Sequence, residues 1–394
     1  MDMATYQLIV NSGSTSKKYA LACQGRVLAR AHLERTYAGG YQFVVTVDER
    51  EYIQEIAPEL RKKASVIFLE TCVRLKVLLS TDEVKTIAFR IVAPGTYFTQ
   101  HRVLGLGMLE RLRGVCALAP AHIRVTLEDI EEVAEGLPKR KLLGISDSAF
   151  HTTMPAVSRH YALDPEFAAT YDVYRFGYHG LSAAGITYML KRNNTLPKRL
   201  VVVHVGGGVS VTAVEEGKSV DTSMGFLPLT GVPMATRAGD LDAGALFGLL
   251  ARTGESTEQL LRRLYHDSGL VQYANLGTGG FKDILIAAKV GNTQAAQALS
   301  KYSYHLRKEL AAAVAVLGGV DTVVLTGTAL VRSPRLRAHT IDGLSFLGII
   351  LDAQKNELCG SGEGRIEASD RVPIYVIQTR EMEEMARVAI ELNQ

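Results

Sequence analysis

The stretch "YQLIVNSGSTSKKYALA", residues 6–22, decides how the first part of this chain folds. An apolar run rich in β-favouring residues enters a short polar loop, and a second apolar run leaves it. Gly13 supplies a turn residue between the two runs, so the pattern predicts two antiparallel strands with a tight connection. Gly25 and Arg26 then mark a second turn.

The same layout returns in "RLVVVHVGGGVSVTAVEEGKSVD", residues 199–221. Two apolar runs flank a glycine-rich turn, and Gly13 of the first hairpin aligns with Gly206 of the second. Two such hairpins, about half the chain apart, predict a duplicated domain.

Strands alternate with helices along the rest of the chain, which is typical of α/β domains. Short apolar runs predict strands at 86–92, 141–146 and 321–327. Helical periodicity predicts helices over 301–319 and over 242–253, and the aspartate that begins the second range can cap it.

Composition narrows the classes of protein to consider. The chain has 394 residues, 47% hydrophobic and 22% charged, with a net charge of +3, which predicts a soluble protein of two abutting domains. Without a long basic run there is no electrostatic reason to expect nucleic acid or a membrane as a partner. No apolar run is long enough to span a bilayer, and no signal peptide precedes the first strand. Four scattered cysteines indicate reduced thiols in a cytoplasmic protein.

The two glycine-rich turns are candidates for anion binding. Successive small residues can aim backbone N–H groups at an anion, and Ser14, Thr15, Ser16 and Lys18 add hydroxyls and a charge. A single turn of this kind would more simply be solvated, but phosphate needs donors from more than one side. Neither turn fits a P-loop or a dinucleotide motif, because a strand and not a helix follows each.

Two further segments place a polar side chain where a ligand could reach it. Asp147 follows a predicted strand, where a carboxylate can hold Mg²⁺, although a helix N-cap is the simpler interpretation. His179 lies between Gly177 and Gly180, which allow a close approach to a ligand, and the alternative is a buried, hydrogen-bonded histidine.

Cations occur in two unexpected places. Arg90 lies inside the apolar run 86–92, so it must point to a carboxylate, an anion or water. The loop 221–244 is rich in Gly, Pro, Thr and Ser and holds one cation, Arg237, which is suited to clamping a phosphoryl group. His122 follows closely after a proline in "APAHI".

In their order along nearly the whole chain, these segments resemble the acetate kinase family, whose fold belongs to the sugar kinase, Hsp70 and actin superfamily. "NSGSTSKKY" resembles its Asn-x-Gly-Ser-Ser/Thr-Ser-x-Lys motif. "FRIVAPG" is similar to its His-Arg-x-Val-His-Gly-Gly segment, with Arg90 kept and Ala93 in place of a histidine. The stretches "APAH", "SDSAFHTTMP", "RFGYHGLS" and "DTSMGFLPLTGVPMATRAGDLD" match closely.

The resemblance implies an α/β fold of two duplicated actin-like (ribonuclease H-like) domains, with mixed β-sheets flanked by helices and an active site in the interdomain cleft. It implies an N-terminal domain of residues 1–150 plus 381–394. A C-terminal domain of residues 151–380 would carry the phosphoryl-donor side and a homodimer interface. The implied activity is reversible, Mg²⁺-dependent phosphoryl transfer between a donor and a short-chain carboxylate such as acetate, forming acetyl phosphate.

The resemblance also implies a role for each matching residue. Phosphate would be bound by Asn11, Ser14, Ser16, Lys18, Gly206, Gly207 and Gly208. Catalysis would use Arg90, His122, Asp147, His179 and Arg237. Mg²⁺ would be held near Asn11 and Glu381. The methyl group of the acid would lie in a small pocket of Val92, Ala121, Tyr178 and Pro228.

The donor side departs from the family pattern. The family has Gly-Ile-Gly-Glu-Asn after the strand 321–327, where this chain has "TGTALVRSP", and its Ser-Ser-Asp-Phe-Arg appears here as "TGGFKD". The glycines that would let a backbone lie against adenosine are missing. The residues concerned are Gly280, Phe281, Lys282, Thr328 and Ala329.

Several alternatives stay open at this point. ATP, the default of the family, could bind through different contacts, or pyrophosphate could be the donor and need no adenosine pocket. The chain could also be a non-catalytic relative that binds a metabolite. Acetate, propionate and butyrate remain alternatives as the acceptor.

Overall fold

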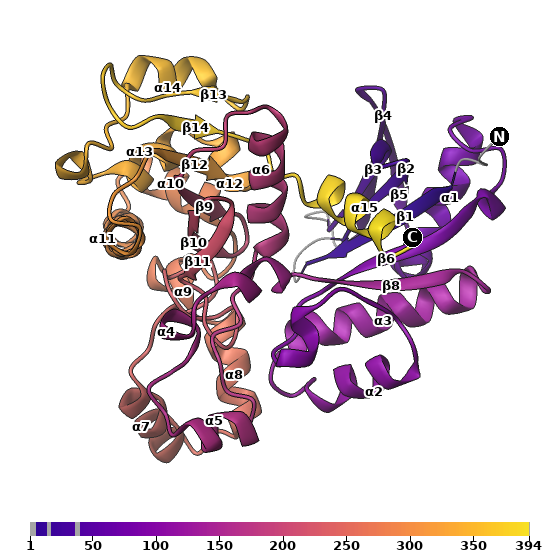
Figure 1. The fold of residues 1–394 in the computed structure, drawn as a ribbon, viewed down its shortest axis with the longest axis horizontal. Coiled ribbons are helices and arrows are strands. Elements are labelled where there is room, and N and C mark those ends of the chain that lie inside the picture. The colour runs from indigo at the N-terminus through magenta and orange to yellow at the C-terminus, as the bar shows by residue number, and fades with distance from the viewer. Residues whose placement is uncertain (1–4, 14–16, 36–39, 394) are drawn as a thin grey trace. The chain divides into compact units, whose positions relative to one another are not determined.

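The computed structural model describes residues 5–13, 17–35 and 40–393 (Figure 1). The chain divides into two compact units. Unit 1 comprises Met1–Ala149 and Arg380–Gln394, and unit 2 comprises Phe150–Thr379. Each unit has one mixed β-sheet with helices packed against it.

The opening hairpin is confirmed and lies within the sheet of unit 1. The register pairs Tyr6 with Cys23 and Ser12 with Lys17. Gln24 and Gly25 follow with φ of 50° and 76°, which gives the next turn the twist that a two-residue hairpin favours. Among the described residues this sheet has eight strands, in the spatial order β5 (Arg50–Ile56), β4 (Tyr41–Val47), β3 (Arg26–Arg35), β2 (Lys17–Cys23), β1 (Tyr6–Ser12), β6 (Val84–Ile91), β8 (Lys141–Ser146) and β7 (Arg102–Val103).

The second hairpin is also confirmed, in the sheet of unit 2. Its strands pair antiparallel from Val209 opposite Val205 to Glu215 opposite Arg199. Among the described residues this sheet has six strands, in the order β11 (Lys218–Thr222), β10 (Val209–Glu215), β9 (Arg199–Val205), β12 (Thr322–Thr326), β14 (Ile374–Val376) and β13 (Gly364–Arg365).

The two sheets share one topology. In unit 1, β1–β2–β3 run antiparallel and β1–β6–β8 run parallel, with β7 antiparallel to β8. In unit 2, β9–β10–β11 run antiparallel and β9–β12–β14 run parallel, with β13 antiparallel to β14. The same order and the same directions confirm the predicted duplication, and both hairpins occupy the same place in their sheets.

Helices from distant parts of the chain complete unit 1. The C-terminal helix α15 packs against β1, β3 and β6, and α3 packs against β6 and β1. α15 buries Met382, Met385, Ala386 and Ala389, whose spacing of three and four residues puts them on one helix face. The α-helices of this unit are α1 (Ala64–Arg74), α2 (Leu106–Gly114), α3 (Pro120–Gly136) and α15 (Glu381–Glu391).

The predicted helices of unit 2 are confirmed, although the one predicted over 301–319 runs from Thr293 to Val316. The helix predicted over 301–319 begins earlier, because the Asn292 side chain accepts from Ala295 N and caps a longer helix. Asp242 caps α7 as predicted, accepting from Ala245 N. The α-helices of this unit are α4 (Ala156–Arg159), α5 (Pro165–Thr170), α6 (Gly180–Arg192), α7 (Ala243–Thr253), α8 (Thr257–His266), α9 (Gly269–Tyr273), α10 (Phe281–Lys289), α11 (Thr293–Val316), α12 (Thr328–Arg332), α13 (Pro334–Ile341) and α14 (Ala353–Cys359).

Short 3₁₀ segments connect some of these elements: η1 (Pro58–Lys63), η2 (Thr81–Glu83), η3 (Thr96–Thr99), η4 (Ala149–Thr153) and η5 (Ser345–Leu347). Within the described ranges, no helix is both long enough and apolar enough to cross a bilayer. The four cysteines are free thiols.

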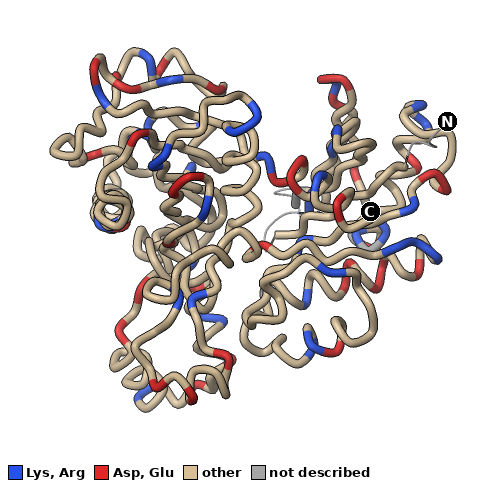
Figure 2. The backbone as a smooth tube through the Cα atoms, viewed as in Figure 1, with Lys and Arg blue, Asp and Glu red and all other residues tan. Residues whose placement is uncertain are grey.

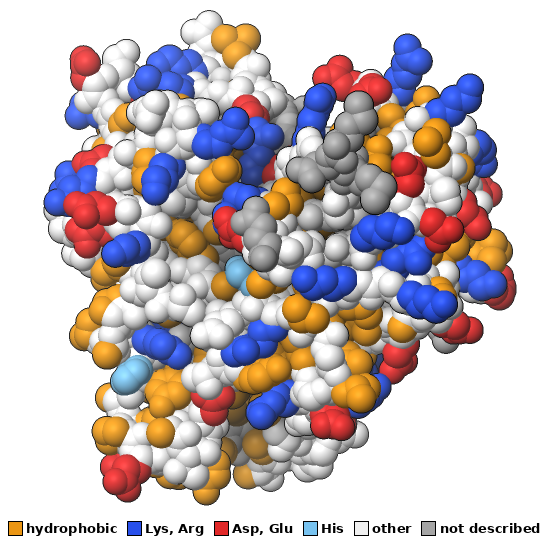
Figure 3. Space-filling model, turned by 45° about the vertical axis from the view of Figure 1, so that its right-hand side comes forward, with side chains coloured by type: hydrophobic (Ala, Val, Ile, Leu, Met, Phe, Trp, Pro, Cys, Tyr) orange, Lys and Arg blue, Asp and Glu red, His pale blue; other side chains and the backbone are white. Residues whose placement is uncertain are grey.

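Charged side chains of both signs are spread along both units (Figure 2). On the face shown in Figure 3, blue and red side chains are intermixed among the described residues. Neither sign dominates that face.

Candidate active site

Three predicted residues of unit 1 meet at the carboxyl ends of parallel strands. Asn11 lies near the end of β1, Arg90 lies near the end of β6, and Asp147 directly follows β8. Because β1, β6 and β8 run parallel, these ends share one edge of the sheet, where ligands bind in α/β folds. Arg90 Nη2 lies 2.8 Å from Asp147 Oδ2, and Arg90 Nη1 lies 3.3 Å from Asn11 Oδ1.

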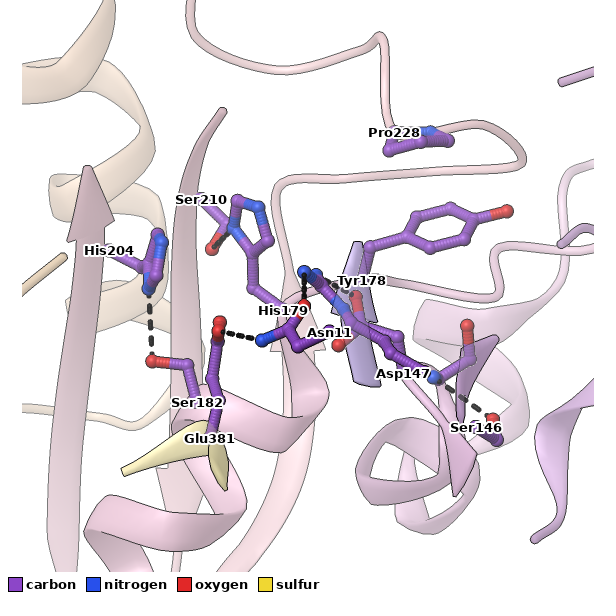
Figure 4. A network of polar contacts seen from close by, with 12 residues as sticks. Asn11, Ser146, Asp147, Tyr178, His179, Ser182, His204, Ser210, Pro228 and Glu381 are labelled. Carbon is purple, nitrogen blue, oxygen red and sulfur yellow. Dashed lines mark hydrogen bonds and ion pairs between the residues drawn. The ribbon is translucent and has the colours of Figure 1, made fainter. Parts of the chain in front are cut away.

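Asn11 connects this pair to the C-terminal helix. Its amide nitrogen donates to Glu381 Oε2 at 2.8 Å, and Glu381 is the buried first residue of α15 (Figure 4). The amide thus presents its oxygen to a cation and its NH₂ group to a carboxylate, matching donor to acceptor at both ends. A continuous polar network runs from Glu381 through Asn11 and Arg90 to Asp147.

The network keeps Arg90 charged. Burial disfavours the cation, but the carboxylates of Asp147 and Glu381 outweigh it and raise the pKa of Arg90 above its ordinary value. Asp147 is fully buried. Arg90 therefore keeps its positive charge at this edge of the sheet, next to Asp147 and Asn11.

Oxygen atoms of Asn11 and Glu381 are ligands that suit a hard divalent cation. Among the described residues, no group of three or more His, Cys, Asp or Glu side chains is arranged to hold a metal ion. The set therefore fits a cation such as Mg²⁺, which is commonly held by one or two protein oxygens together with the phosphates of a substrate.

The backbone around Asp147 is fixed at three successive N–H groups. Ser146 N donates to His101 Nδ1 at 3.1 Å, Asp147 N to Ile91 O at 2.9 Å, and Ser148 N to Ser146 Oγ at 3.1 Å. The carboxylate is thereby aimed at Arg90 before any ligand binds. The sequence analysis missed His101, since nothing local in "FTQHRV" indicates a contact with residue 146.

The opening hairpin separates two adjacent lysines. Lys18 pairs with Asn11 across the strands, so both side chains are on one face of the sheet. Lys17 therefore points to the other face, where it is buried and forms an ion pair with Asp129. Glu132 lies 3.7 Å from the same ammonium. This division supports Lys18, and not Lys17, as the lysine available to phosphate.

The remaining unit 1 candidates have simple placements. His122 is the buried third residue of α3, where its backbone N donates to Ala119 O at 3.1 Å. Val92 is buried directly after β6. Ser14 and Ser16 lie outside the described residues, as does the side chain of Ala121.

His179 of unit 2 has an unusual backbone. Its φ of 58° and ψ of 22° are left-handed, and it is the residue directly before α6. Its Nδ1 lies 2.9 Å from Ser210 Oγ on β10, and its ring lies 4.2 Å from the ring of His204 (Figure 4). His204 Nδ1 in turn lies 2.9 Å from Ser182 Oγ.

His204 was not predicted as a site residue. It is a polar residue inside the otherwise apolar strand β9, which is the signal that singled out Arg90 in β6. The same reasoning could have found it.

The turn Gly206–Gly208 needs glycine for space and not for its backbone angles, because none of the three residues has a left-handed φ. A Cβ atom on Gly208 would lie 3.0 Å from His179 Nε2 and 3.1 Å from Arg237 Nη1. One on Gly206 would lie 3.3 Å from His204 Nε2. The turn, His179 and Arg237 therefore converge within unit 2, as an anion site requires.

Arg237 is held in a buried setting by its loop. Its Nη1 donates to Pro228 O at 2.7 Å, and its guanidinium lies 5.5 Å from the centre of the Tyr265 ring. Tyr178 is fully buried, and its hydroxyl donates to Phe226 O at 2.8 Å. The cation and the proposed pocket residues Tyr178 and Pro228 are thus set by the same loop.

Comparison with known proteins decides the family. The profile of the acetokinase family matches residues 6–387. The chain belongs to the acetokinase family. The predicted resemblance is confirmed, and with it the duplicated actin-like fold and a phosphotransferase that acts on a carboxyl group.

Curated relatives and solved structures agree with this family over almost their full lengths. An acetate kinase of Shouchella clausii is 31% identical, with 98% of this chain and 99% of that protein aligned. An acetate kinase of Thermoanaerobacter pseudethanolicus is 32% identical over 95% of each chain. Among structures, the acetate kinase of Porphyromonas gingivalis has a TM-score of 0.82 at 27% identity, covering 99% of this chain and 100% of that one. A propionate kinase from Francisella tularensis has a TM-score of 0.85 at 27% identity, covering 97% and 98%.

The segment that departs from the family on the donor side forms the short helix α12. Gly327 precedes it with a φ of 91°, and a Cβ atom there would lie 2.3 Å from Val205 O, so only glycine fits. Thr328 is exposed and Ala329 is half-buried.

A buried arginine fixes the other end of α12. Arg337 is fully buried and donates to Leu330 O and Val331 O, each at 2.9 Å. It also donates to Asn356 Oδ1 at 2.6 Å and to Gly360 O at 3.0 Å. These bonds occupy the carbonyls that end α12 and tie them to α13 and α14.

The second departing segment begins α10. Gly280 N donates to Asp283 Oδ2 at 2.8 Å, which caps the helix. Phe281 is buried against Tyr302, with ring centres 5.1 Å apart, while Lys282 is exposed. Phe281 is therefore a core residue, and Lys282 is the member of this segment that can meet a ligand.

His101 gives a prediction for stability. Burial, followed by the charge of Arg387, lowers the pKa of His101 from 6.5 to about 4. Between these two pKa values, His101 binds a proton in the unfolded chain but not in the folded chain. The free energy of unfolding therefore falls as pH falls through this window. The loss is on the order of 3 kcal/mol. His101→Asn keeps an acceptor near the Nδ1 position and removes the titration, so its melting temperature should fall less between about pH 6.5 and about pH 4.

The control for this measurement is the exposed His160. His160→Asn should leave the pH dependence of the wild-type chain unchanged. If His101→Asn shows the same loss of stability with acid as the wild type, the assignment of a neutral His101 is wrong.

Proposed function

We propose that the chain is a Mg²⁺-dependent kinase that reversibly transfers a phosphoryl group between a donor and a short-chain carboxylate. Acetate is the first substrate to test, and acetyl phosphate is the product. The observation that carries the proposal is the pair of preorganised cationic sites, Arg90 in unit 1 and Arg237 with His179 in unit 2. Relatives named acetate kinase and propionate kinase support the choice of acceptor.

The chemistry requires little covalent work from the protein. A carboxylate oxygen forms a bond to phosphorus while the bond from phosphorus to the donor oxygen breaks, and that electron pair leaves with the donor. Negative charge spreads over the phosphoryl oxygens in the transition state, so fixed cations and N–H donors stabilise it most.

The chain's own residues divide this work. Hydrogen bonds to Asp147 and Asn11 already orient the Arg90 side chain, so it loses little conformational entropy on binding an oxyanion. In unit 2, Arg237 and the Nε2 side of His179 both face Gly208. Each set presents fixed donors that suit phosphate oxygens.

The metal would be held by Asn11 and Glu381. Mg²⁺, when bound, neutralises charge on the phosphate oxygens. Glu381 lies at the N-terminus of α15 beside Asn11, so its carboxylate and the amide oxygen of Asn11 are the groups that would hold the ion.

Arg237→Ala tests the assignment directly. The variant should lose at least about 100-fold in kcat, because a fixed charge at the transition state is removed while the buried core is kept. Acyl phosphate is measured by its conversion to a hydroxamate. Arg192→Ala, an exposed arginine at the end of α6, is the matched control and should behave as the wild type. Near-normal turnover in Arg237→Ala would refute the proposed role.

For the donor we propose ATP, the default of the family, with pyrophosphate as the alternative. Both donors need to be tested, because the sequence at α12 and α10 differs from the family pattern on the proposed donor side. The residues proposed for phosphoryl transfer match the family pattern. The wild-type chain should make hydroxamate with ATP when ATP, GTP and pyrophosphate are compared in parallel. Strong turnover with ATP and none with pyrophosphate eliminates the small donor, and the reverse result eliminates ATP. No product with any donor would favour a metabolite-binding protein.

The preference of the protein for one chain length of the acid is expected to depend on few contacts. Tyr178 and Pro228 are proposed to line a pocket for its alkyl group within unit 2. One methylene changes the binding energy in such a pocket by roughly 1–3 kcal/mol. Acetate, propionate and butyrate should therefore differ in kcat/KM, and the same assay ranks them.

We also propose that the protein is a homodimer joined through unit 2. The helix α7 has the sequence AGALFGLLART, yet none of its residues, all of them described, is buried. Phe247 is 68% exposed and Leu249 is 37% exposed. An apolar helix without a core partner fits the centre of an interface, and a second copy of the chain can supply the matching surface by two-fold symmetry.

Phe247→Lys should convert a dimer into a monomer of 42.8 kDa, because a charge placed at the centre of an apolar interface must lose its water. Light scattering during size-exclusion chromatography measures the mass. Phe346→Lys is the control, since Phe346 is 71% exposed in the same unit but lies in η5. A monomeric wild-type chain, or a Phe247→Lys variant that stays dimeric, contradicts this interface.

A further inference from the structure

The left-handed backbone of His179 needs an explanation. Residues with a Cβ atom seldom adopt φ near 58°, and they keep it only where neighbouring contacts force it. The imidazole does not cap α6 with a side-chain hydrogen bond. Contacts elsewhere in unit 2 must therefore hold this conformation.

His151 makes the contact that does so. It is 1% exposed, its Nε2 lies 3.1 Å from Tyr178 O, and its Nδ1 lies 2.9 Å from Ser219 Oγ. A carbonyl oxygen can only accept, so Nε2 carries the proton and donates to Tyr178 O. Nδ1 then accepts from the Ser219 hydroxyl. The two partners together select one neutral tautomer of His151.

The same imidazole also packs over the preceding glycine. Gly177 has a φ of 71°, and a Cβ atom there would lie 2.7 Å from His151 Cδ2 and 2.7 Å from Thr222 Cγ2. No larger residue fits between these two side chains. The segment 177–179 is therefore clamped at its first residue by packing and at its second by a hydrogen bond.

Tyr178 adds a third restraint through its hydroxyl, which donates to Phe226 O at 2.8 Å. With the peptide between Tyr178 and His179 fixed on one side by His151, the direction of the His179 side chain is fixed too. Its Nδ1 then meets Ser210 Oγ, and its Nε2 side faces Gly208 and Arg237.

We propose that His151 is a positioning residue for phosphoryl transfer, which orients His179 by holding the carbonyl of Tyr178. The proposal rests on the function proposed above. The bond from His151 reaches the peptide directly before His179, so His151 would act through His179 and not on the reacting atoms. An apolar ring of the same size could fill the space but could not donate to Tyr178 O, and this peptide would then turn toward another donor.

Two substitutions separate the two nitrogen atoms. His151→Gln places an amide NH₂ near the Nε2 position and keeps a donor for Tyr178 O. His151→Asn reaches only the Nδ1 position and loses that donor. Ser219→Ala removes the other partner and keeps the bond to Tyr178.

The kcat of each variant should depend on whether a hydrogen-bond donor to Tyr178 O remains. His151→Asn should lose about 10-fold to about 100-fold in kcat, because misplacing a group by about 1 Å has effects of that size. Its KM values should change less than about 3-fold, since His179 acts in the transition state. His151→Gln and Ser219→Ala should keep kcat within about 3-fold of the wild type. A merely structural histidine would give lower melting temperatures with unchanged kcat per folded molecule.

A spectroscopic measurement follows His179 itself. Ring-nitrogen NMR signals of ¹⁵N-histidine-labelled protein, assigned for His179 with a His179→Gln variant, should move in His151→Asn and stay in place in His151→Gln. The proposal is overturned if His151→Asn keeps wild-type kcat and wild-type His179 signals. It is also overturned if the Gln and Asn variants lose equal activity.

The NMR experiment keeps the inference separate from the proposed function. If the wild-type chain makes no acyl phosphate, displaced His179 signals in His151→Asn still support the positioning role, and unmoved signals still refute it. If His151→Asn does not fold, His151→Gln and Ser219→Ala decide. If these two variants keep the His179 NMR signals and the kcat of the wild type, the positioning role is supported. If they lose both while the melting temperature is unchanged, the role is refuted.

Discussion

The buried ion pair between Arg90 and Asp147 is the constraint on which the candidate site depends. Removing two charges from water is costly, and a buried carboxylate is tolerated only when its geometry and hydrogen bonds are good. Here the parallel strands β6 and β8 bring the two residues to the same sheet edge. Backbone bonds at residues 146 to 148 then aim Asp147 before the pair forms. The cation is therefore in place in advance, which is the property that electrostatic catalysis requires.

The duplicated scaffold carries different chemistry in its two copies. At the edge of the unit 1 sheet, charge is held by strand residues, since Arg90 lies within β6. In unit 2, the strand β9 supplies the imidazole of His204, which packs against His179, and the cation comes from the loop that holds Arg237. The hairpins β1–β2 and β9–β10 thus occupy the same place in their sheets. The side chains that serve each candidate site come from different elements of the two units. The glycine at 208 follows from this, because His179 and Arg237 approach it from outside the hairpin, whereas Gly206 is crowded by His204 of β9.

The sequence predicted features that depend on neighbours along the chain. The hairpins, the strand before Asp147 and the capped helix at Asp242 were found because their signals lie within a few residues. The roles of His101 and His151 were missed, since their partners lie 45 and 27 residues away and no local pattern indicates the contact. The early start of α11 was missed because the cap at Asn292 begins the helix at Thr293, ahead of the predicted start at residue 301. Local signals define elements, whereas the orientation of a site residue depends on packing between elements.

The segments that depart from the family pattern are held by contacts within unit 2. Arg337 takes up the carbonyls of Leu330 and Val331, so α12 is held from inside unit 2 and does not need a ligand to order it. What α12 offers to solvent is a side chain, Thr328, in place of the glycine backbone of the family pattern. His179 and Arg237, which are proposed to face phosphate, are held by Ser210 on β10 and by the carbonyl of Pro228, and neither contact involves α12. The sequence of α12 can therefore vary without removing the bonds that hold His179 and Arg237.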